Sequence, residues 1–183
     1  MEYDQAGNIN AERYYDGAGV PVNCKGGYAG ITKEFNTKKQ VVREAWFDKE
    51  GQPTTLGDTY YALQKEYDEA GNVSVEKYLD KDGNPTACAA GYEMIWKRYD
   101  KKKQVIYESY LDREGRPMAD SRGVYQTTYD YNKKGQVIQE QYFDADGQPT
   151  LCKDGYFKVV RTYNKKGKMT KEEYLMPDGS KKE

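Results

Sequence analysis

The fold of this chain is decided by Tyr67-Asp68-Glu69-Ala70-Gly71-Asn72 and the stretch after it, which ends in Asp80-Lys81-Asp82-Gly83-Asn84-Pro85. We predict a turn at each hexapeptide, because Asp can accept hydrogen bonds from the backbone N–H groups that follow it and Gly tolerates a positive φ near the end of the turn. Val73 to Leu79, between the two turns, is rich in β-branched and aromatic residues, which favour strands. The stretch therefore predicts strands joined by tight turns, and the frequent Gly and Pro disfavour helix.

The same pattern returns every 32 residues along the chain. The first turn begins with an aromatic residue followed by Asp or Asn. Later in each repeat, a Glu, a second aromatic residue and a Gly recur with the same spacing, and we call each set of equivalent positions a column. Because no insertion breaks the register, we predict one array over residues 1–183, with repeats 3–34, 35–66, 67–98, 99–130 and 131–162 and a partial repeat 163–183. The columns are Tyr3, Phe35, Tyr67, Tyr99, Tyr131 and Tyr163; Glu12, Glu44, Glu76, Glu108, Glu140 and Glu172; Tyr14, Trp46, Tyr78, Tyr110, Tyr142 and Tyr174; and Gly19, Gly51, Gly83, Gly115, Gly147 and Gly179.

The predicted fold class is all-β, an elongated tandem array of 32-residue β-hairpin repeats. Two architectures fit: a single twisted antiparallel meander, or a β-solenoid in which equivalent strands stack directly on one another. The glutamate column favours the meander, because stacked coils would hold like charges only about 4.8 Å apart. In either architecture each repeat contacts only its neighbours, so folding is expected to be modular.

Composition excludes several classes of function. The 183 residues include 19 Tyr and no His, and 29 basic residues balance 30 acidic ones. Without histidine the chain can form neither a Ser-His-Asp triad nor a His-ligated metal site. No stretch is apolar enough for a transmembrane helix, and the balanced charge argues against a nucleic-acid binder. We therefore expect no enzymatic activity, no catalytic residues, no cofactor, no metal, no nucleic-acid partner and no membrane insertion.

The glutamate and aromatic columns are two residues apart, so they share one face of a strand. On that face a ring could cover the apolar side of a sugar while the carboxylate accepts hydrogen bonds from hydroxyl groups. The interpretation we favour is structural, with the rings forming the core between repeats. A discrete ligand site, if the chain has one, is expected in the second and third repeats, which hold both tryptophans. Its candidate residues are Trp46, Tyr60, Tyr61, Tyr78, Trp96, Glu44 and Glu76.

Other columns vary in ways that carry expectations. Cysteines stand two periods apart, too distant in a meander for disulfides, so free thiols are expected. A Gly-Tyr pair, as in Gly91-Tyr92, becomes Gly123-Val124 in the fourth repeat, which marks that repeat as different. Lysines gather in the first turns and acidic residues in the second, which predicts a basic and an acidic rim at opposite strand ends. The cysteines are Cys24, Cys88 and Cys152.

Two families resemble these repeats. Tyr-Asp-x-x-Gly-Asn at Tyr3–Asn8 and Tyr67–Asn72 resembles the YD repeats of RHS-type bacterial surface and toxin-shell proteins. Trp46-Phe47-Asp48-Lys49-Glu50-Gly51 and the matching residues 142–147 resemble, more loosely, the hairpins of cell-wall-binding repeats in choline-binding proteins and clostridial toxin tails. Both resemblances imply a bacterial, exported, non-catalytic repeat array.

The leading functional hypothesis is a non-enzymatic repeat scaffold or interaction module of a bacterial surface or exported protein, located outside the cell or on its surface. The alternative is binding of a glycan or cell-wall polymer through the face that carries the aromatic and glutamate columns. The expected partners are accordingly a protein or a cell-wall glycan. End-to-end self-association is a further expectation, because repeat arrays without polar caps expose their ends.

Overall fold

The computed structural model describes residues 1–55 and 59–182, and the regular structure of these residues is entirely β-strand. The chain divides into two compact units, unit 1 from Met1 to Ala89 and unit 2 from Ala90 to Glu183. The boundary falls inside the third predicted repeat, and a single array over the whole chain stays a prediction. The strands of unit 1 are β1 (Glu2–Tyr3), β2 (Ile9–Arg13), β3 (Gly30–Phe35), β4 (Val41–Phe47), β5 (Ala62–Tyr67) and β6 (Val73–Leu79). Those of unit 2 are β7 (Met94–Tyr99), β8 (Val105–Leu111), β9 (Gln126–Tyr131), β10 (Val137–Phe143), β11 (Lys158–Tyr163) and β12 (Met169–Leu175).

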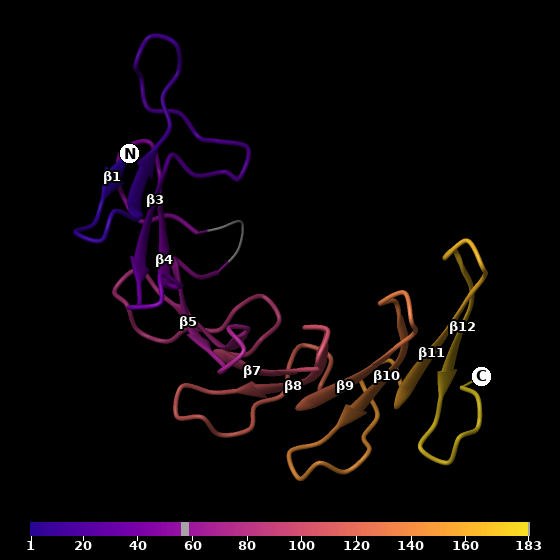
Figure 1. The fold of residues 1–183 in the computed structure, drawn as a ribbon. Helices are drawn as coiled ribbons and strands as arrows, with labels where there is room; N and C mark the ends of the chain where they lie inside the picture. The colour runs from indigo at the N-terminus through magenta and orange to yellow at the C-terminus, as the bar shows by residue number, and fades with distance from the viewer. Residues whose placement is uncertain (56–58, 183) are drawn as a thin grey trace. The chain divides into compact units, whose positions relative to one another are not determined.

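Within each unit the strands pair in chain order and always antiparallel, as Figure 1 shows for each unit in turn. Equivalent strands of successive repeats, such as β3 and β5, are separated by the strand between them. That order is a meander, and a stacked solenoid would have placed equivalent strands in direct contact. The predicted all-β fold of hairpin repeats is confirmed within each unit.

The first turn of each repeat joins an odd strand to the even strand after it. In the turn that begins at Asp68, the carboxylate oxygen Oδ1 accepts a hydrogen bond of 2.8 Å from the backbone N–H of Asn72, and Gly71 donates its N–H to the carbonyl of Asp68. The fourth residue of this turn has a positive φ in every repeat. Glycine fills that position in four repeats, but Lys39 and Lys103 adopt φ of 61° and 63° there. Lysine in this conformation carries a steric cost that glycine does not.

The second turn follows each even strand and uses the same side-chain acceptor, except after β12, where Met176 stands at the place of the Asp. Asp80 accepts N–H hydrogen bonds from Asp82 and Asn84, and proline closes the turn by bridging back, as Pro85 does to Leu79. These bonds hold the pKa of Asp80 below its usual value, with the bond from the Asn84 N–H as the largest cause. The carboxylates of the aspartates in this column thus accept hydrogen bonds from the backbone of their own turns.

A third turn lies where the sequence predicts only a loose connection. Cys24 accepts a hydrogen bond from the backbone N–H of Gly27 and donates its own N–H to the carbonyl of Tyr28, at 3.0 and 2.8 Å. In the fourth repeat Asp120 takes the place of cysteine in the same geometry. The turn returns the chain so that the residue after Gly, normally Tyr, packs over the neighbouring strands. The cysteines of this column are free, as expected, and Cys88 and Cys152 are buried.

Register divides the side chains between two faces of each sheet. Lys33, Glu44 and Leu63 lie opposite one another across β3, β4 and β5, and so do Glu34, Arg43 and Gln64. We call the face that carries the glutamate and aromatic columns the spine face. The other face, which carries the columns of Thr32, Arg43 and Glu34, is called the variable face.

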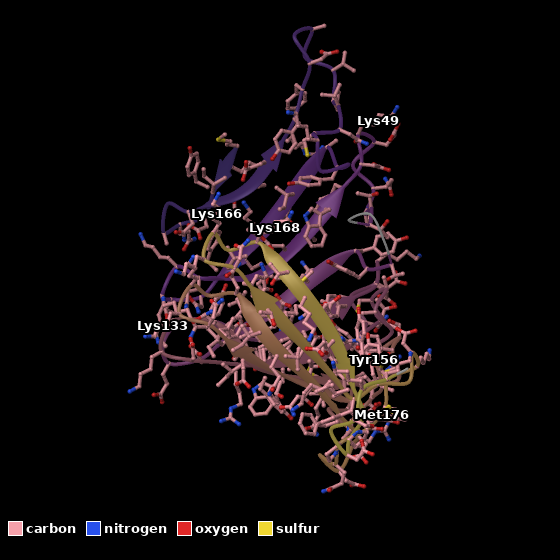
Figure 2. The ribbon with its side chains drawn as sticks, turned by 90° about the vertical axis from the view of Figure 1, so that its right-hand side faces the viewer. Lys49, Lys133, Tyr156, Lys166, Lys168 and Met176 are labelled. Atoms are coloured by element: carbon pink, nitrogen blue, oxygen red, sulfur yellow. The ribbon has the colours of Figure 1, made fainter. Side chains whose placement is uncertain are left out.

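Neighbouring repeats are also joined at the edge formed by the first turns. Tyr67 donates its hydroxyl to the backbone carbonyl of Val41 in the preceding repeat at 2.6 Å, and Tyr131 makes the same bond to Val105. The tyrosine of the Tyr-Asp pair is therefore a clasp between repeats, while the Asp after it stabilises the turn. In unit 2 the lysines of the first turns, among them Lys133 and Lys166, lie at the strand ends opposite Met176 of the second turns (Figure 2). This placement agrees with the predicted separation of the two rims.

Candidate functional site

The aromatic rings of the spine face form a ladder between repeats. Trp46 and Tyr60 pack edge to face with ring centroids 5.9 Å apart, and Tyr60 packs on Tyr78 at 4.8 Å. In unit 2, Tyr92 stacks on Tyr110 at 4.7 Å. Aromatic pairs at these separations stabilise a structure beyond the area that they bury. Tyr60, which packs on both Trp46 and Tyr78, is therefore a rung that links the aromatic column of one repeat to the next.

Four of the six rings in the aromatic column are buried, Tyr14 is half-buried and Tyr174 is exposed. Trp46 is 4 % exposed, Tyr78 9 % and Tyr110 2 %. Burial raises the pKa of the Tyr110 hydroxyl, as the negative charge of Glu108 also does. Burial likewise raises the pKa of Tyr28 to about 12. The rings thus form the core of the spine face, in agreement with the interpretation favoured from the sequence.

The glutamate column is paired along the same face. Glu12 bonds Lys33 at 3.0 Å and Glu44 bonds Lys65 at 2.5 Å, and in each pair the partner lies 21 residues further along the chain. In unit 2 the partner at the same spacing is Tyr129 for Glu108 and Arg161 for Glu140. These carboxylates are partly buried and already hold a cation or a hydroxyl. Opposite charges therefore lie beside Glu12, Glu44 and Glu140, and a neutral hydroxyl lies beside Glu108.

The structure places the predicted site residues in three surroundings. Trp46 and Tyr78 belong to the aromatic column, and Tyr60 is the rung between them. Glu44 forms its ion pair with Lys65. Glu76 lies opposite Lys65 in the register of β5 and β6. These residues belong together on the spine face of unit 1. A ligand-binding role for them stays a prediction.

Tyr61 and Trp96 lie elsewhere. Tyr61 precedes β5 and lines a hollow on the variable face of unit 1, described below. Trp96 belongs to the variable face of unit 2, where it is 40 % exposed and packs edge to face on Tyr107 at 5.6 Å. The Arg98 guanidinium lies 5.9 Å from the same Tyr107 ring. Trp96 is therefore the tryptophan available to a ligand from solvent, while Trp46 is enclosed.

The fourth repeat replaces an aromatic rung with a polar cluster centred on Arg122. Val124 stands where other repeats have tyrosine, and the Arg122 guanidinium occupies the ring's place, 5.0 Å from the ring centroid of Tyr142 and 6.0 Å from that of Tyr110. Arg122 also donates to Asp120 at 2.7 Å and to the buried Thr127 hydroxyl at 3.2 Å. Burial opposes the charge of Arg122, but the surrounding phenol and carboxylate groups raise the pKa of its guanidinium on balance. The Gly-Val departure in the sequence was the visible signal of this cluster.

The variable face differs from the spine face in how much its columns change between repeats. The position of Thr32 is held in turn by an amide, an aromatic, a hydroxyl and an aliphatic side chain, and the position of Glu34 changes charge. The spine columns that contain Ile31, Lys33, Glu44 and Trp46 keep their chemistry except at Thr127 and Tyr129, both in the fourth repeat. The variable columns are Thr32, Gln64, Trp96, Thr128 and Val160; Glu34, Glu66, Arg98, Asp130 and Thr162; and Ala11, Arg43, Val75, Tyr107, Gln139 and Lys171.

A hollow of about 170 Å³ lies on the variable face of unit 1, between the ends of β4 and β5. Ala45 and Ala62 form its floor, and they belong to an apolar cluster with Leu79, against which Phe47 packs. The floor is closed by small side chains, since Ala45 and Ala62 lie directly opposite each other. This hollow was missed at the sequence level, where an alanine pair gives no signal until the register is known. Its lining residues are Arg43, Ala45, Trp46, Phe47, Pro53, Tyr61, Ala62, Asp80 and Lys81.

Two kinds of feature are absent from the described residues. These residues contain no group of three or more Cys, Asp or Glu residues placed to hold a metal ion. Nor does this part of the chain include a helix long and apolar enough to span a membrane.

Comparison with known proteins gives a limited result. No family model matches the chain, and no curated protein matches its sequence. The similar solved structures include one described as "Crystal Structure of TcdB2-TccC3-Cdc42", with 14 % identity and a TM-score of 0.40 over 98 % of this chain. Two related ones are "Crystal Structure of TcdB2-TccC3" (14 % identity, TM-score 0.40, 97 % of this chain) and "Crystal Structure of TcdB2-TccC3-TEV" (11 %, 0.31, 100 %). The chain spans 11 % of the length of each of these proteins.

Proposed function

We propose that the chain is a non-enzymatic repeat scaffold that presents a protein-interaction surface, as part of a bacterial surface or exported protein. The observation that carries this proposal is that side chains are largely constant between repeats on one face and vary between repeats on the other. The spine face repeats its glutamate and aromatic columns with a departure in the fourth repeat, while the three variable columns change from repeat to repeat. A scaffold needs a constant face to hold its repeats together and a free face to display different side chains. The location outside the cell rests on the resemblance of the repeats alone.

The scaffold proposal is tested by exchanging residues between repeats on one face at a time. Replacing Thr128 and Asp130 of β9 by Gln and Glu, which stand at the equivalent places in β5, should leave thermal unfolding unchanged. Replacing Thr127 and Tyr129 of the same strand by the equivalent Leu and Lys should lower the unfolding temperature. Equal effects of the two exchanges would show that the faces have no separate roles.

The interaction role is tested with a bacterial cell-envelope extract passed over the immobilised chain. A partner that uses the variable face should be retained by the wild type and lost when Thr128 and Asp130 are exchanged. Retention unaffected by this exchange and by a second exchange at Arg43 and Gln64 would refute the role assigned to the variable face. Turnover of any substrate by the purified chain would refute the non-enzymatic assignment.

Glycan binding is the second candidate function, and the exposure of Trp96 favours it. An exposed indole beside Tyr107 offers a flat apolar surface of the kind that sugars stack on. A glycan array probed with the wild type and with Trp96→Ala tests this candidate. Binding lost in Trp96→Ala would place the glycan on the variable face. Binding lost in Glu44→Gln but retained in Trp96→Ala would place it on the face with the aromatic and glutamate columns, as first expected from the sequence.

A further inference from the structure

We propose that the hollow between Ala45 and Ala62 is a socket for one large apolar side chain, flanked by a carboxylate, from a protein partner. This inference rests on the proposed interaction role and adds the place and the chemistry of the contact. The socket has the size for such a side chain, because an apolar cavity of about 150 Å³ accommodates benzene. The hollow measures about 170 Å³, so one aromatic ring or branched aliphatic side chain fills it.

Comparison between repeats shows what the chain itself places at the equivalent junctions, one of which, between β2 and β3, keeps a hollow of about 140 Å³. In the first repeat, the side chain of Arg13 lies across Gly30: a Cβ built on that glycine would be 3.6 Å from the Arg13 Cγ. Arg13 reaches on to Gly51, where its Nη1 is 3.7 Å from the corresponding Cβ position. A long side chain therefore lies over the junction of β2 and β3.

Unit 2 covers the equivalent places in the same way. Gln126 stands at the position of Ala62, and its Oε1 extends to 3.9 Å from the Cβ position of Gly147. In the next repeat Lys158 takes this position and lies over the Phe157 ring, with Nζ 5.7 Å from the ring centroid. Only between β4 and β5, among these four junctions, do two alanines face each other with no long side chain of their own to cover them. Ala45 and Ala62 are themselves only 7 % and 2 % exposed, so a partner side chain gains mainly by contact with the walls of the hollow that solvent still reaches, Phe47, Pro53 and Tyr61.

The rim of the hollow selects for negative charge. Arg43 and Lys81 both line it. Their ion-pair partners, Glu34 and Asp82, are exposed side chains outside the lining, with N–O distances of 3.2 and 3.8 Å. Exposed pairs of this kind are weak and exchange readily. An incoming carboxylate can therefore take either cation.

The acid on the rim does not cancel this preference. Asp80 lines the hollow, but its Oδ1 accepts the N–H groups of Asp82 and Asn84 at 2.9 and 2.8 Å, and its Oδ2 accepts the Asn84 side-chain amide at 3.4 Å. The carboxylate is therefore held in its own turn. The chemistry that fits is an aromatic or branched aliphatic side chain next to a carboxylate, as at an acidic and apolar segment of a partner protein.

The test uses N-acetyl-L-phenylalanine as the smallest probe of this chemistry. The full chain is labelled with ¹³C in its alanine methyl groups, so that Ala45 and Ala62 report from the floor itself. Saturable shifts of these two methyl signals are expected, with N-acetyl-L-phenylalanine amide about two- to fivefold weaker because it lacks the charge. N-acetyl-alanine, which cannot fill the hollow, should leave both signals in place.

Two variants close the socket with residues that the chain already uses at the equivalent places. Ala62→Gln copies Gln126 and Ala45→Arg copies Arg13, and each should weaken probe binding at least about tenfold. Thr128→Gln places the same glutamine on the variable face outside the hollow and should bind as the wild type does. The second variant keeps the test valid if the first fails to fold.

The result separates this inference from the scaffold proposal. Absence of methyl shifts, equal binding of N-acetyl-alanine, or unchanged binding in both closed variants would overturn the socket. Equal binding of the amide would overturn its carboxylate part. The exchange of residues between repeats tests the scaffold independently, because it is read from thermal unfolding without a ligand.

Discussion

Arg122 is the position where a single substitution should reveal most about how the repeats are held together. Its guanidinium donates to Asp120, Glu140, Tyr110 and Thr127, at 2.7, 3.1, 3.0 and 3.2 Å. Arg122→Ala removes all four contacts and leaves the Asp120 carboxylate, which is 4 % exposed, without its cation. Breaking a buried ion pair costs about 3–5 kcal/mol. Because the Arg122 side chain is itself 36 % exposed, we expect a smaller cost than that, about 2–3 kcal/mol.

The contrasting variant restores an aromatic rung. Replacing Asp120 by Cys, Arg122 by Gly, Val124 by Tyr and Thr127 by Ile gives the fourth repeat the residues that the first repeat has at these places. Exchanging a buried ionic cluster for well-packed apolar groups is often neutral or stabilising. We expect the fourfold variant to lie within about 1 kcal/mol of the wild type, although Arg122→Gly alone should be strongly destabilising. The four residues would then act as one set.

The assay is urea unfolding followed by tryptophan fluorescence in a Trp46→Phe background, where Trp96 reports on unit 2 alone. The slope of the transition must stay constant for the free energies of unfolding to be compared. An Arg122→Ala effect below about 0.5 kcal/mol would refute the claim that the cluster replaces a rung, because surface substitutions are of that size. A fourfold variant as unstable as the sum of its single changes would refute the claim that the residues form a set.

Three further predictions follow from the turns, the ladder and the clasps. Lys39→Gly and Lys103→Gly should each raise the free energy of unfolding by about 0.5–1 kcal/mol, because glycine adopts the positive φ without strain; urea unfolding measures the gain, and a loss would contradict the strain. The folded-state pKa values of Tyr28 and Tyr110 lie above the usual 10.0, so these two hydroxyls contribute their full stability below pH 10. This contribution is lost as the pH rises above 10, because the hydroxyls ionise there in the unfolded chain but only at higher pH in the folded chain, at about 12 for Tyr28. The part of the phenolate absorbance that comes from buried tyrosines should therefore appear only together with the loss of circular dichroism, and full phenolate absorbance in a chain that keeps its native circular dichroism would disprove the burial. Tyr131→Phe, which removes the hydroxyl bonded to the Val105 carbonyl, should cost about 0.5–1.5 kcal/mol in thermal or urea unfolding, whereas Tyr3→Phe, at an exposed position, should cost nothing.

The repeat period and the hairpin order could be predicted because both depend on local features. Asp and Gly at fixed offsets specify each turn whatever surrounds it, and Asp68 and Gly71 behave in the structure as their residue types predict. The meander was predictable because the like charges of the glutamate column cannot be stacked. The reason for the column became visible only with the register, which brings Lys33 and Lys65 beside Glu12 and Glu44.

The third turn and the hollow could not be predicted, each for a physical reason. Cysteine rarely begins a turn of this kind, so Cys24 carried no turn signal, although Asp120 at the equivalent place did. The hollow depends on Ala45 and Ala62 meeting across two strands, and a single sequence does not state which residues face each other. The predicted ligand site mixed residues of both faces for the same reason: Trp46 and Trp96 have the same residue type but opposite exposure.

A repeat chain has to solve two problems with one pattern. Identical repeats stabilise one another through their shared contacts, yet an array of identical hairpins can pair in several registers. The fourth repeat offers a physical solution, because Arg122 finds its acceptors only between Tyr110 and Tyr142, where Asp120 and Thr127 also replace the usual Cys and apolar residues. A single buried polar group is the best-attested way to fix register in other repeating structures. On this view the repeated contacts of the spine face hold neighbouring repeats together, and the Arg122 cluster fixes the register of their strands. The variable columns then take no part in either task and can differ between repeats.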